Sequence, residues 1–157
     1  MTTRVGFSEI PKGLMSTMLE AESYINSAGF DIKLLELIRL CVSHINQCAY
    51  CIDMHFKEAI STGEDLQRLY SLPVWRDTSY YSTKEQACLA WAEYLTRPYA
   101  EYDEQGLFEN LLSFFNKENI ANLTLVIIQI NAWNRLMKSF GIEAGHYQVE
   151  RKTGEVS

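Results

Sequence analysis

The chain has 157 residues, 47% of them hydrophobic, and its 20 acidic against 14 basic residues give a net charge of −6. A chain of this length can bury a core without support from disulfides or metal ions, so we expect a single domain over residues 1–157. With an acidic balance and no Lys/Arg cluster to neutralise phosphates, nucleic acid and anionic membranes are excluded as expected partners.

The N-terminal segment does not suggest export. Residues 1–9 contain no apolar run of signal-peptide length. The longest apolar passage, residues 120–133, is interrupted by polar residues and falls short of the ~20 residues that a membrane-spanning helix needs. We therefore expect a cytoplasmic protein. Residues 142–157 are polar, and we expect them to form a frayed tail or a partner-contacting arm beside a core of about residues 10–140.

Apolar residues recur with a helical period through the first part of the chain. The pattern that begins at Leu14 stops around Gly29 and predicts a first helix. Asp31 is suited to cap the next helix, because its carboxylate can accept a hydrogen bond from a free backbone amide of the first turn. The apolar face of that second helix consists of Leu34, Leu37, Ile38, Cys41, Val42 and Ile45.

A break between helices is predicted at residues 46–47, and a third helix is predicted over about residues 48–62. Gly63 would end this helix as a left-handed cap. A short helical turn over residues 65–70 follows, and it leads into a loop with three aromatic residues. We expect these rings to pack in the core or at a subunit interface; they are Trp75, Tyr80 and Tyr81.

Helices are also predicted in the second half of the chain. A capping box formed by Ser82 and Glu85 predicts the start of a helix that runs through about residue 95. Two more helices are predicted C-terminal to it, over about residues 103–115 and 118–140. Strand-like alternation extends over no more than a few residues anywhere. The sequence therefore predicts an all-α fold.

The four cysteines fall into two kinds. Cys41 and Cys88 lie inside apolar helical patterns, and in a chain without an export signal we expect them to be reduced core residues. Cys48 and Cys51 have motif spacing instead, and His55 follows four positions after the second. On a helix that begins at Cys48, these three side chains share one face and the two sulfurs can form a disulfide with little rearrangement.

The start of a helix is a favourable place for a thiolate. Cysteines in the first turn face unpaired backbone amides and the positive end of the helix dipole, which both lower a thiol pKa. An imidazolium at His55 would add to this effect. Cys48 and Cys51 are therefore the candidate redox centre. His44 and His146 have no such neighbours, and we interpret them as structural or exposed.

Other interpretations of the CxxC motif remain open. A thioredoxin fold requires a strand before the motif, whereas a helix is predicted here. A structural zinc site needs four N or S ligands. Cys48, Cys51 and His55 would supply three of them, and His44 or His146 would have to supply the fourth. His55 by itself could also be a histidine at the edge of the core, hydrogen-bonded to the backbone.

Glu36 also permits two interpretations. It lies between apolar neighbours, and burial would raise its pKa toward values useful for proton transfer. The simpler alternative is a surface ion pair with Arg39, three residues further along the helix. Periodicity by itself favours the surface pair, since functional carboxylates are uncommon.

Taken together, these residues resemble a known signature. Glu36, eleven intervening residues, Cys48-x-x-Cys51, three intervening residues and His55 resemble the active site of the alkylhydroperoxidase D (AhpD) core, within the carboxymuconolactone decarboxylase superfamily. The similarity spans about residues 10–140. It also includes Ser43, Asn46, Asp53, Met54, Gly63, Arg68-Leu-Tyr70, Trp75-Arg76 and Ile130-Asn-Ala-Trp-Asn-Arg135.

The resemblance implies an AhpD-like helical fold and a role for each signature residue. Cys51 would be oxidised to a sulfenic acid, Cys48 would be proton donor and resolving thiol, and Glu36 and His55 would form a proton relay. It also favours a buried Glu36 over the surface pair. No cofactor is implied beyond an external dithiol or thiol reductant. A homo-trimer or homo-hexamer with active sites near subunit contacts is implied as well.

These observations predict a thiol-dependent peroxidase and dithiol oxidoreductase that reduces organic hydroperoxides or a disulfide on a partner redox protein. One alternative stays within the superfamily, as a decarboxylase acting on a muconolactone-like ring. Members with that activity generally lack the paired cysteines. A second alternative is a redox-sensing binding module, whose dithiol would switch association without catalytic turnover.

Overall fold

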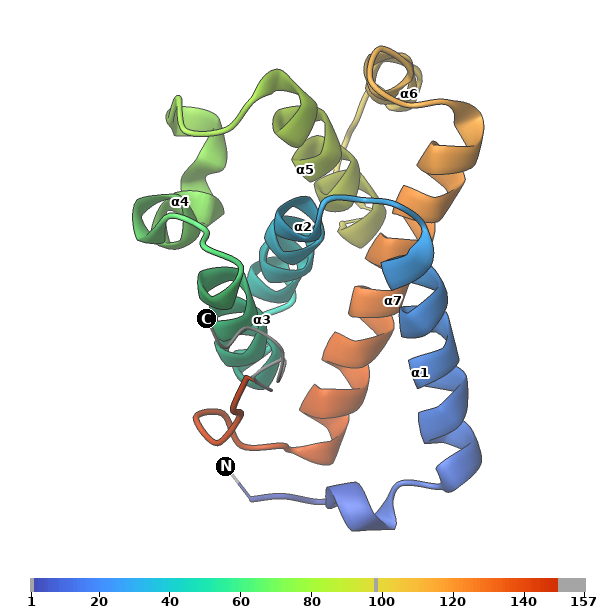
Figure 1. The fold of residues 1–157 in the computed structure, drawn as a ribbon, viewed down its shortest axis with the longest axis vertical. Helices are drawn as coiled ribbons and strands as arrows, with labels where there is room; N and C mark the ends of the chain where they lie inside the picture. The colour runs from blue at the N-terminus through green and yellow to red at the C-terminus, as the bar shows by residue number, and fades with distance from the viewer. Residues whose placement is uncertain (1, 98, 150–157) are drawn as a thin grey trace, which may run out of the picture.

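The computed structural model describes residues 2–97 and 99–149, and every regular element among them is helical (Figure 1). The α-helices are α1 (Lys12–Ser27), α2 (Ile32–Ile45), α3 (Ala49–Ser61), α4 (Leu66–Ser71), α5 (Thr83–Thr96), α6 (Glu104–Leu112) and α7 (Lys117–Phe140). The 3-10 helices are η1 (Phe7–Glu9) and η2 (Leu72–Asp77). The prediction of an all-α fold is confirmed.

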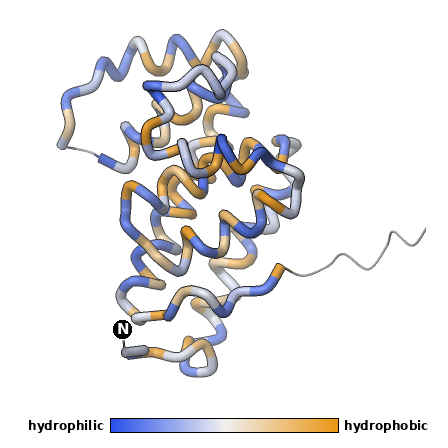
Figure 2. Tube along the Cα trace, turned by 90° about the vertical axis from the view of Figure 1, so that its left-hand side faces the viewer, coloured by the Kyte–Doolittle hydropathy of each residue, from blue (hydrophilic) through white to orange (hydrophobic). Residues whose placement is uncertain are grey.

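Helix α2 is the central element of the fold. It packs against α3, α5 and α7, and all its residues from Leu34 to Ser43 are buried. Its apolar side chains divide between two clusters, one shared with α1, α5, α6 and α7 and the other with α3, α4, η2 and α5. Hydrophobic and hydrophilic positions alternate along the helices (Figure 2), as expected for elements that bury one face. Because α2 is covered on both sides, its polar residues are enclosed as well.

Local capping signals in the sequence correspond to observed helix ends. Asp31 accepts a hydrogen bond from the backbone N–H of Lys33 at 3.0 Å, and Ser82 and Glu85 form the predicted capping box. Gly63 has a φ angle of 78°, the left-handed conformation predicted for it. These signals depend on residues a few positions apart, which is why the sequence was sufficient to predict them.

Some boundaries differ from the predictions. Helix α3 begins at Ala49, and Cys48 is its N-cap with extended backbone. The expected loop after α4 contains η2, in which Pro73 lies in the first turn and does not need its missing N–H. Helix α6 ends at Leu112 and not near Phe115, whose ring instead turns into the core cluster around α2. Packing outweighs local periodicity at these positions.

The segment after α7 folds back onto α3. Lys57 Nζ donates to the carbonyl oxygens of Gly145 and Tyr147 at 3.4 and 3.0 Å. The N–H of Gly145 donates to Asp53 Oδ2 at 3.1 Å, and the Tyr147 hydroxyl hydrogen-bonds to Glu58. Residues 142–149 therefore differ from the frayed tail that their polar composition predicts. The remainder of that predicted tail, residues 150–157, lies outside the described residues.

The N-terminal segment lies against the C-terminal end of α7 (Figure 1). The backbone amides of Arg4 and Val5 donate to the carbonyl oxygen of Phe140 at 2.7 and 3.2 Å, and Arg4 Nε donates to Ser139 O at 2.7 Å. These donors satisfy carbonyl groups that the end of a helix leaves free. Across the described residues, no helix is both long and apolar enough to cross a membrane.

Candidate active site

The cysteine pair lies at the junction between α2 and α3. Gln47 adopts a φ angle of 53° there, which reverses the chain between the two helices. The Cys48 N–H then donates to Ser43 O at 3.0 Å, and Cys51 follows in the first turn of α3. The two Cα atoms are 5.3 Å apart, and the side chains are joined in a disulfide. Both cysteines are buried, with exposed fractions of 1% and 3%.

Helix α7 holds this junction in place through polar side chains. Asn46 Nδ2 donates to the side-chain oxygens of Asn131 and Asn134, at 2.9 Å in each case. Asn134 Nδ2 donates to Ser43 Oγ at 3.1 Å, and Lys138 Nζ donates to Asn46 O at 2.7 Å. The polar residues near the end of α7 therefore form a hydrogen-bonding scaffold for the turn that precedes Cys48.

His55 and Glu36 meet between α3 and α2. His55 lies one turn after Cys51 on α3, and its Nδ1 is 2.8 Å from Glu36 Oε2. His55 is 8% exposed and Glu36 is 3% exposed, so the contact is shielded from water. The structure thus joins the predicted site residues in two pairs, Cys48 with Cys51 at the start of α3 and His55, one turn further along α3, with Glu36 of the neighbouring α2.

The pKa of Glu36 is shifted in the opposite direction from the sequence prediction. Burial alone would raise its pKa, as predicted, but the hydrogen bond from His55 and the charges of His55 and Arg39 outweigh burial and hold the pKa below its ordinary value. Arg39 Nη1 donates to Glu36 Oε1 at 2.7 Å. The predicted pair with Arg39 therefore exists, but it is buried and not on the surface. The prediction of a raised pKa is wrong.

Aromatic and apolar side chains surround the cysteines. Met137 is buried against both of them, and Trp133 and Ile142 also pack on this cluster. The ring of Tyr50, between the two cysteines, lies 6.0 Å from the ring of Phe7, centroid to centroid. Burial, together with the nearby charge of Asp53, raises the pKa of Tyr50. Sequence reasoning missed Phe7 and Ile142, because nothing local indicates that the segments before α1 and after α7 return to the region of the cysteines.

The other cysteines and histidines do not join this site. Cys41 and Cys88 are buried free thiols, and burial raises the pKa of each to about 12. His44 is partly buried, which lowers its pKa, whereas His146 is exposed with Nε2 3.7 Å from a Glu143 carboxylate oxygen. In the described part of the chain, no three His, Cys, Asp or Glu side chains gather in a way that could hold a metal ion.

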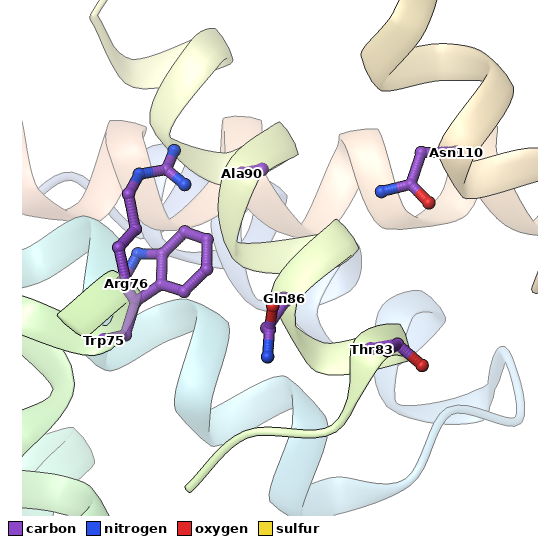
Figure 3. A pocket seen from close by; sticks show the side chains of 6 residues that line it. All are labelled: Trp75, Arg76, Thr83, Gln86, Ala90 and Asn110. Carbon is purple, nitrogen blue, oxygen red and sulfur yellow. The ribbon is translucent and has the colours of Figure 1, made fainter. Parts of the chain in front are cut away.

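A pocket of about 370 Å³ lies between η2, α5 and α6 (Figure 3). The Arg76 guanidinium stacks on the Trp75 ring at 4.1 Å from its centroid, and it is paired with Glu93. Trp75 is 5% exposed and Tyr81 is 3% exposed, so both belong to the core, whereas Tyr80 is 38% exposed. The pocket is lined by Trp75, Arg76, Thr83, Gln86, Ala90 and Asn110, without a cysteine, histidine or carboxylate. The candidate active site is therefore the cysteine pair and not this pocket.

Comparison with known proteins identifies the family of this chain. Residues 12–94 match the model of the carboxymuconolactone decarboxylase family. An uncharacterized protein of Bacillus subtilis (strain 168), YdfG, is 35% identical over 144 residues, which cover 92% of this chain and 98% of that protein.

Solved structures show the same fold. A protein of unknown function from Agrobacterium tumefaciens, a candidate antioxidant defence protein AhpD, is 31% identical with a TM-score of 0.87 and covers 93% of this chain and 100% of that one. A peroxidase-related protein from Ralstonia eutropha JMP134, described as an alkylhydroperoxidase AhpD core, has a TM-score of 0.75 at 18% identity, over 85% of this chain and 72% of that one. Sequence and fold together show that this chain is a member of the carboxymuconolactone decarboxylase family, structurally close to its AhpD-like proteins.

Proposed function

We propose that this protein is a thiol-dependent peroxidase and dithiol oxidoreductase, which reduces organic hydroperoxides or a disulfide on a partner redox protein. The observation that carries the proposal is the cysteine pair at the start of α3 with the His55–Glu36 pair one turn away. A dithiol that closes without rearrangement supplies two electrons, and the buried imidazole and carboxylate supply a route for a proton.

The proposed reaction has three balanced steps. The Cys51 thiolate attacks the terminal oxygen of the hydroperoxide, the O–O bond breaks, and the alkoxide takes a proton to leave as an alcohol. The Cys48 thiol then attacks the sulfenic acid on Cys51, which forms the disulfide and releases water. An external dithiol reduces the disulfide by thiol exchange and returns both cysteines to the thiol state.

The start of α3 favours a thiolate, because free backbone amides and the helix dipole stabilise it both at Cys51 in the first turn and at Cys48, the N-cap. The resemblance to the AhpD core assigns the attacking role to Cys51 and the resolving role to Cys48. His55 is the proton-transfer group one turn away on the same helix, and Glu36 orients it through Nδ1. In this proposal Glu36 and His55 together provide the proton that the leaving alkoxide needs.

Relatives support the class of reaction without identifying a substrate. The A. tumefaciens protein is a candidate antioxidant defence protein, and the R. eutropha protein is described as peroxidase-related. We extend the proposal to a homo-trimer or homo-hexamer that works in the cytoplasm with a dithiol reductant or a partner redox protein.

Single cysteine variants test the proposal. We expect Cys48→Ser to accumulate a sulfenic acid on Cys51 after cumene hydroperoxide treatment, because the resolving thiol is absent. Cys51→Ser should accumulate none. Trapping with a dimedone probe, followed by peptide mass spectrometry, measures both. The reverse pattern would exchange the two roles, and no sulfenic acid in either variant would reject the peroxidase. The amount of hydroperoxide consumed per wild-type protein molecule separates an enzyme from a switch. Consumption of no more than one equivalent, even with a dithiol present, would indicate a redox switch without turnover.

A further inference from the structure

Arg39 connects the candidate active site to a second carboxylate. Its Nη1 donates to Glu36 Oε1 at 2.7 Å, on the oxygen that His55 does not use. Its Nη2 donates to Glu22 Oε2 at 2.8 Å and to Asn26 Oδ1 at 3.0 Å, both on α1. Arg39 is itself 5% exposed, so the guanidinium is held inside the protein between two glutamates.

The polar chain then returns to the cysteines. Trp133 Nε1, on α7, donates to Glu22 Oε1 at 2.9 Å, and the Trp133 side chain packs against the cluster that contains Cys48 and Cys51. Side chains from α3, α2, α1 and α7 thus form a hydrogen-bonded chain from His55, one turn after Cys51, to Trp133 on the cysteine cluster. We call this chain the Arg39 network; it consists of His55, Glu36, Arg39, Glu22 and Trp133.

Stability alone does not account for such a network. Removing charges from water is costly, and buried ion pairs can often be replaced by apolar side chains without loss of stability. Here one guanidinium lies between two carboxylates, and each carboxylate has its second oxygen engaged as well. The arrangement fixes the charge and orientation of Glu36 more strictly than packing would require.

We propose that Arg39 is a positioning residue for the dithiol chemistry, and that Glu22 and Trp133 hold it in place. Arg39 holds one oxygen of Glu36, which leaves the other oxygen aimed at His55 Nδ1. The inference rests on the proposed function, because it assigns a residue that positions the proton relay of the same site. The site thereby extends to α1 and α7.

Charged and titratable groups approach this site from several elements. Glu22 faces Arg39 from α1, His55 faces Glu36 from α3, and Tyr147 of the C-terminal segment also interacts with the charge of Glu36. Helix α7 contributes Trp133, which does not titrate. On the other side of α2, the charges of Arg76 of η2, Glu93 of α5 and Arg97, the C-cap of α5, act on Cys41. Arg39 and Glu22 can therefore be changed singly, with opposite changes in local charge.

The test measures how fast iodoacetamide alkylates Cys51 as a function of pH. All proteins are reduced and carry Cys48→Ser, so that Cys51 is the one thiol of the pair, and peptide mass spectrometry locates the label. The variants added to this background are Arg39→Gln, Arg39→Lys and Glu22→Gln. Arg76→Gln is the matched control, because it removes the same charge from an arginine–glutamate pair on η2 and α5.

We expect Arg39→Gln to move the alkylation midpoint upward by about one pH unit, since a lost positive charge disfavours the thiolate. Glu22→Gln should move it downward, Arg39→Lys should restore it toward the starting value, and Arg76→Gln should leave it unchanged. Loosened packing would not produce shifts of opposite sign. Shifts in the same direction for Arg39→Gln and Glu22→Gln, or none beyond the control, would overturn the inference.

If Arg39→Gln does not fold, the other two variants test the inference. A lower alkylation midpoint in Glu22→Gln, together with a midpoint near the starting value in Arg39→Lys, supports it. An unchanged midpoint in Glu22→Gln overturns it. Alkylation needs no hydroperoxide. Opposite shifts in a protein that consumes no hydroperoxide would therefore reject the proposed function and leave the positioning role of Arg39 standing.

Discussion

Glu36 uses both of its carboxylate oxygens, one toward His55 and the other toward Arg39. Because the side chains of Glu36 and Arg39 are only 4% and 7% exposed, solvent screens their interaction little. The pKa of Glu36 is below its ordinary value despite burial, so the group contributes to folding stability as an anion. This residue therefore links the stability of the protein to the chemistry of the site.

Glu36→Gln tests that link. We expect the variant to lose about 3 kcal/mol of unfolding free energy at pH 7, because Arg39 remains buried with one carboxylate fewer. In the wild type, the stabilisation is complete above the ordinary glutamate pKa of 4.5 and is lost as pH falls through the lower folded-state pKa. The stability gap between the two proteins should thus narrow in acid. Urea unfolding at several pH values measures it.

Glu109→Gln is the control for this experiment, since Glu109 is exposed on α6. It should change stability little at any pH. A Glu36→Gln variant whose stability gap stays constant down to acid pH would contradict the assignment of a stabilising, ionised Glu36.

Residue spacing predicted part of this site well. Cys48, Cys51 and His55 are neighbours in sequence, so helix geometry alone placed them on one face. The side chains of Glu22 and Trp133 could not be placed in the same way, because they meet Arg39 only through the packing of α1 and α7 against α2. The direction of the Glu36 pKa was missed for the same reason, since it depends on partners from other turns and helices.

The turn between α2 and α3 decides where the cysteines lie. Four polar side chains, from α2, the turn and α7, hold it: Ser43, Asn46, Asn131 and Asn134. Helix ends with local signals, such as Asp31 and the Ser82–Glu85 box, could be predicted from sequence. The 3-10 helix η2 and the early end of α6 could not, because tertiary packing decides them.

Asn134→Leu tests the importance of this turn. Asn134 is 0% exposed, and leucine would leave the amide of Asn46 and the hydroxyl of Ser43 each without one buried partner. We expect a loss of about 1–3 kcal/mol in unfolding free energy. Disulfide formation between Cys48 and Cys51 should slow as well, because the turn before Cys48 is held less firmly. Urea unfolding and a timed thiol assay measure the two effects.

Asn122→Leu on the same helix is the matched control. Asn122 accepts one exposed hydrogen bond, from the Tyr24 hydroxyl at 3.0 Å, so its replacement should cost less than about 1 kcal/mol. Equal losses of stability in the two variants, or an unchanged rate of disulfide formation in Asn134→Leu, would show that the scaffold does not position the cysteines.

Two apolar clusters on either side of α2 form most of the core of the molecule, and several large apolar side chains remain outside them. Leu66, Tyr70 and Val74 have exposed fractions of 55%, 64% and 54%. Assembly would remove such surface from water. We expect a solution mass of three or six times the 18.1 kDa chain, measured by light scattering across a range of concentrations. A monomeric mass throughout that range would contradict the proposed homo-oligomer.

A free-thiol count decides whether Cys48 and Cys51 act as a reversible redox pair. Thiols are counted under denaturing conditions, on reduced protein before and after treatment with a slight excess of cumene hydroperoxide. We expect a fall from the four thiols of the sequence to two, localised to Cys48 and Cys51 and reversed by a dithiol, with Cys41 and Cys88 unchanged. Four thiols that persist after the treatment would show that the pair is not redox-active.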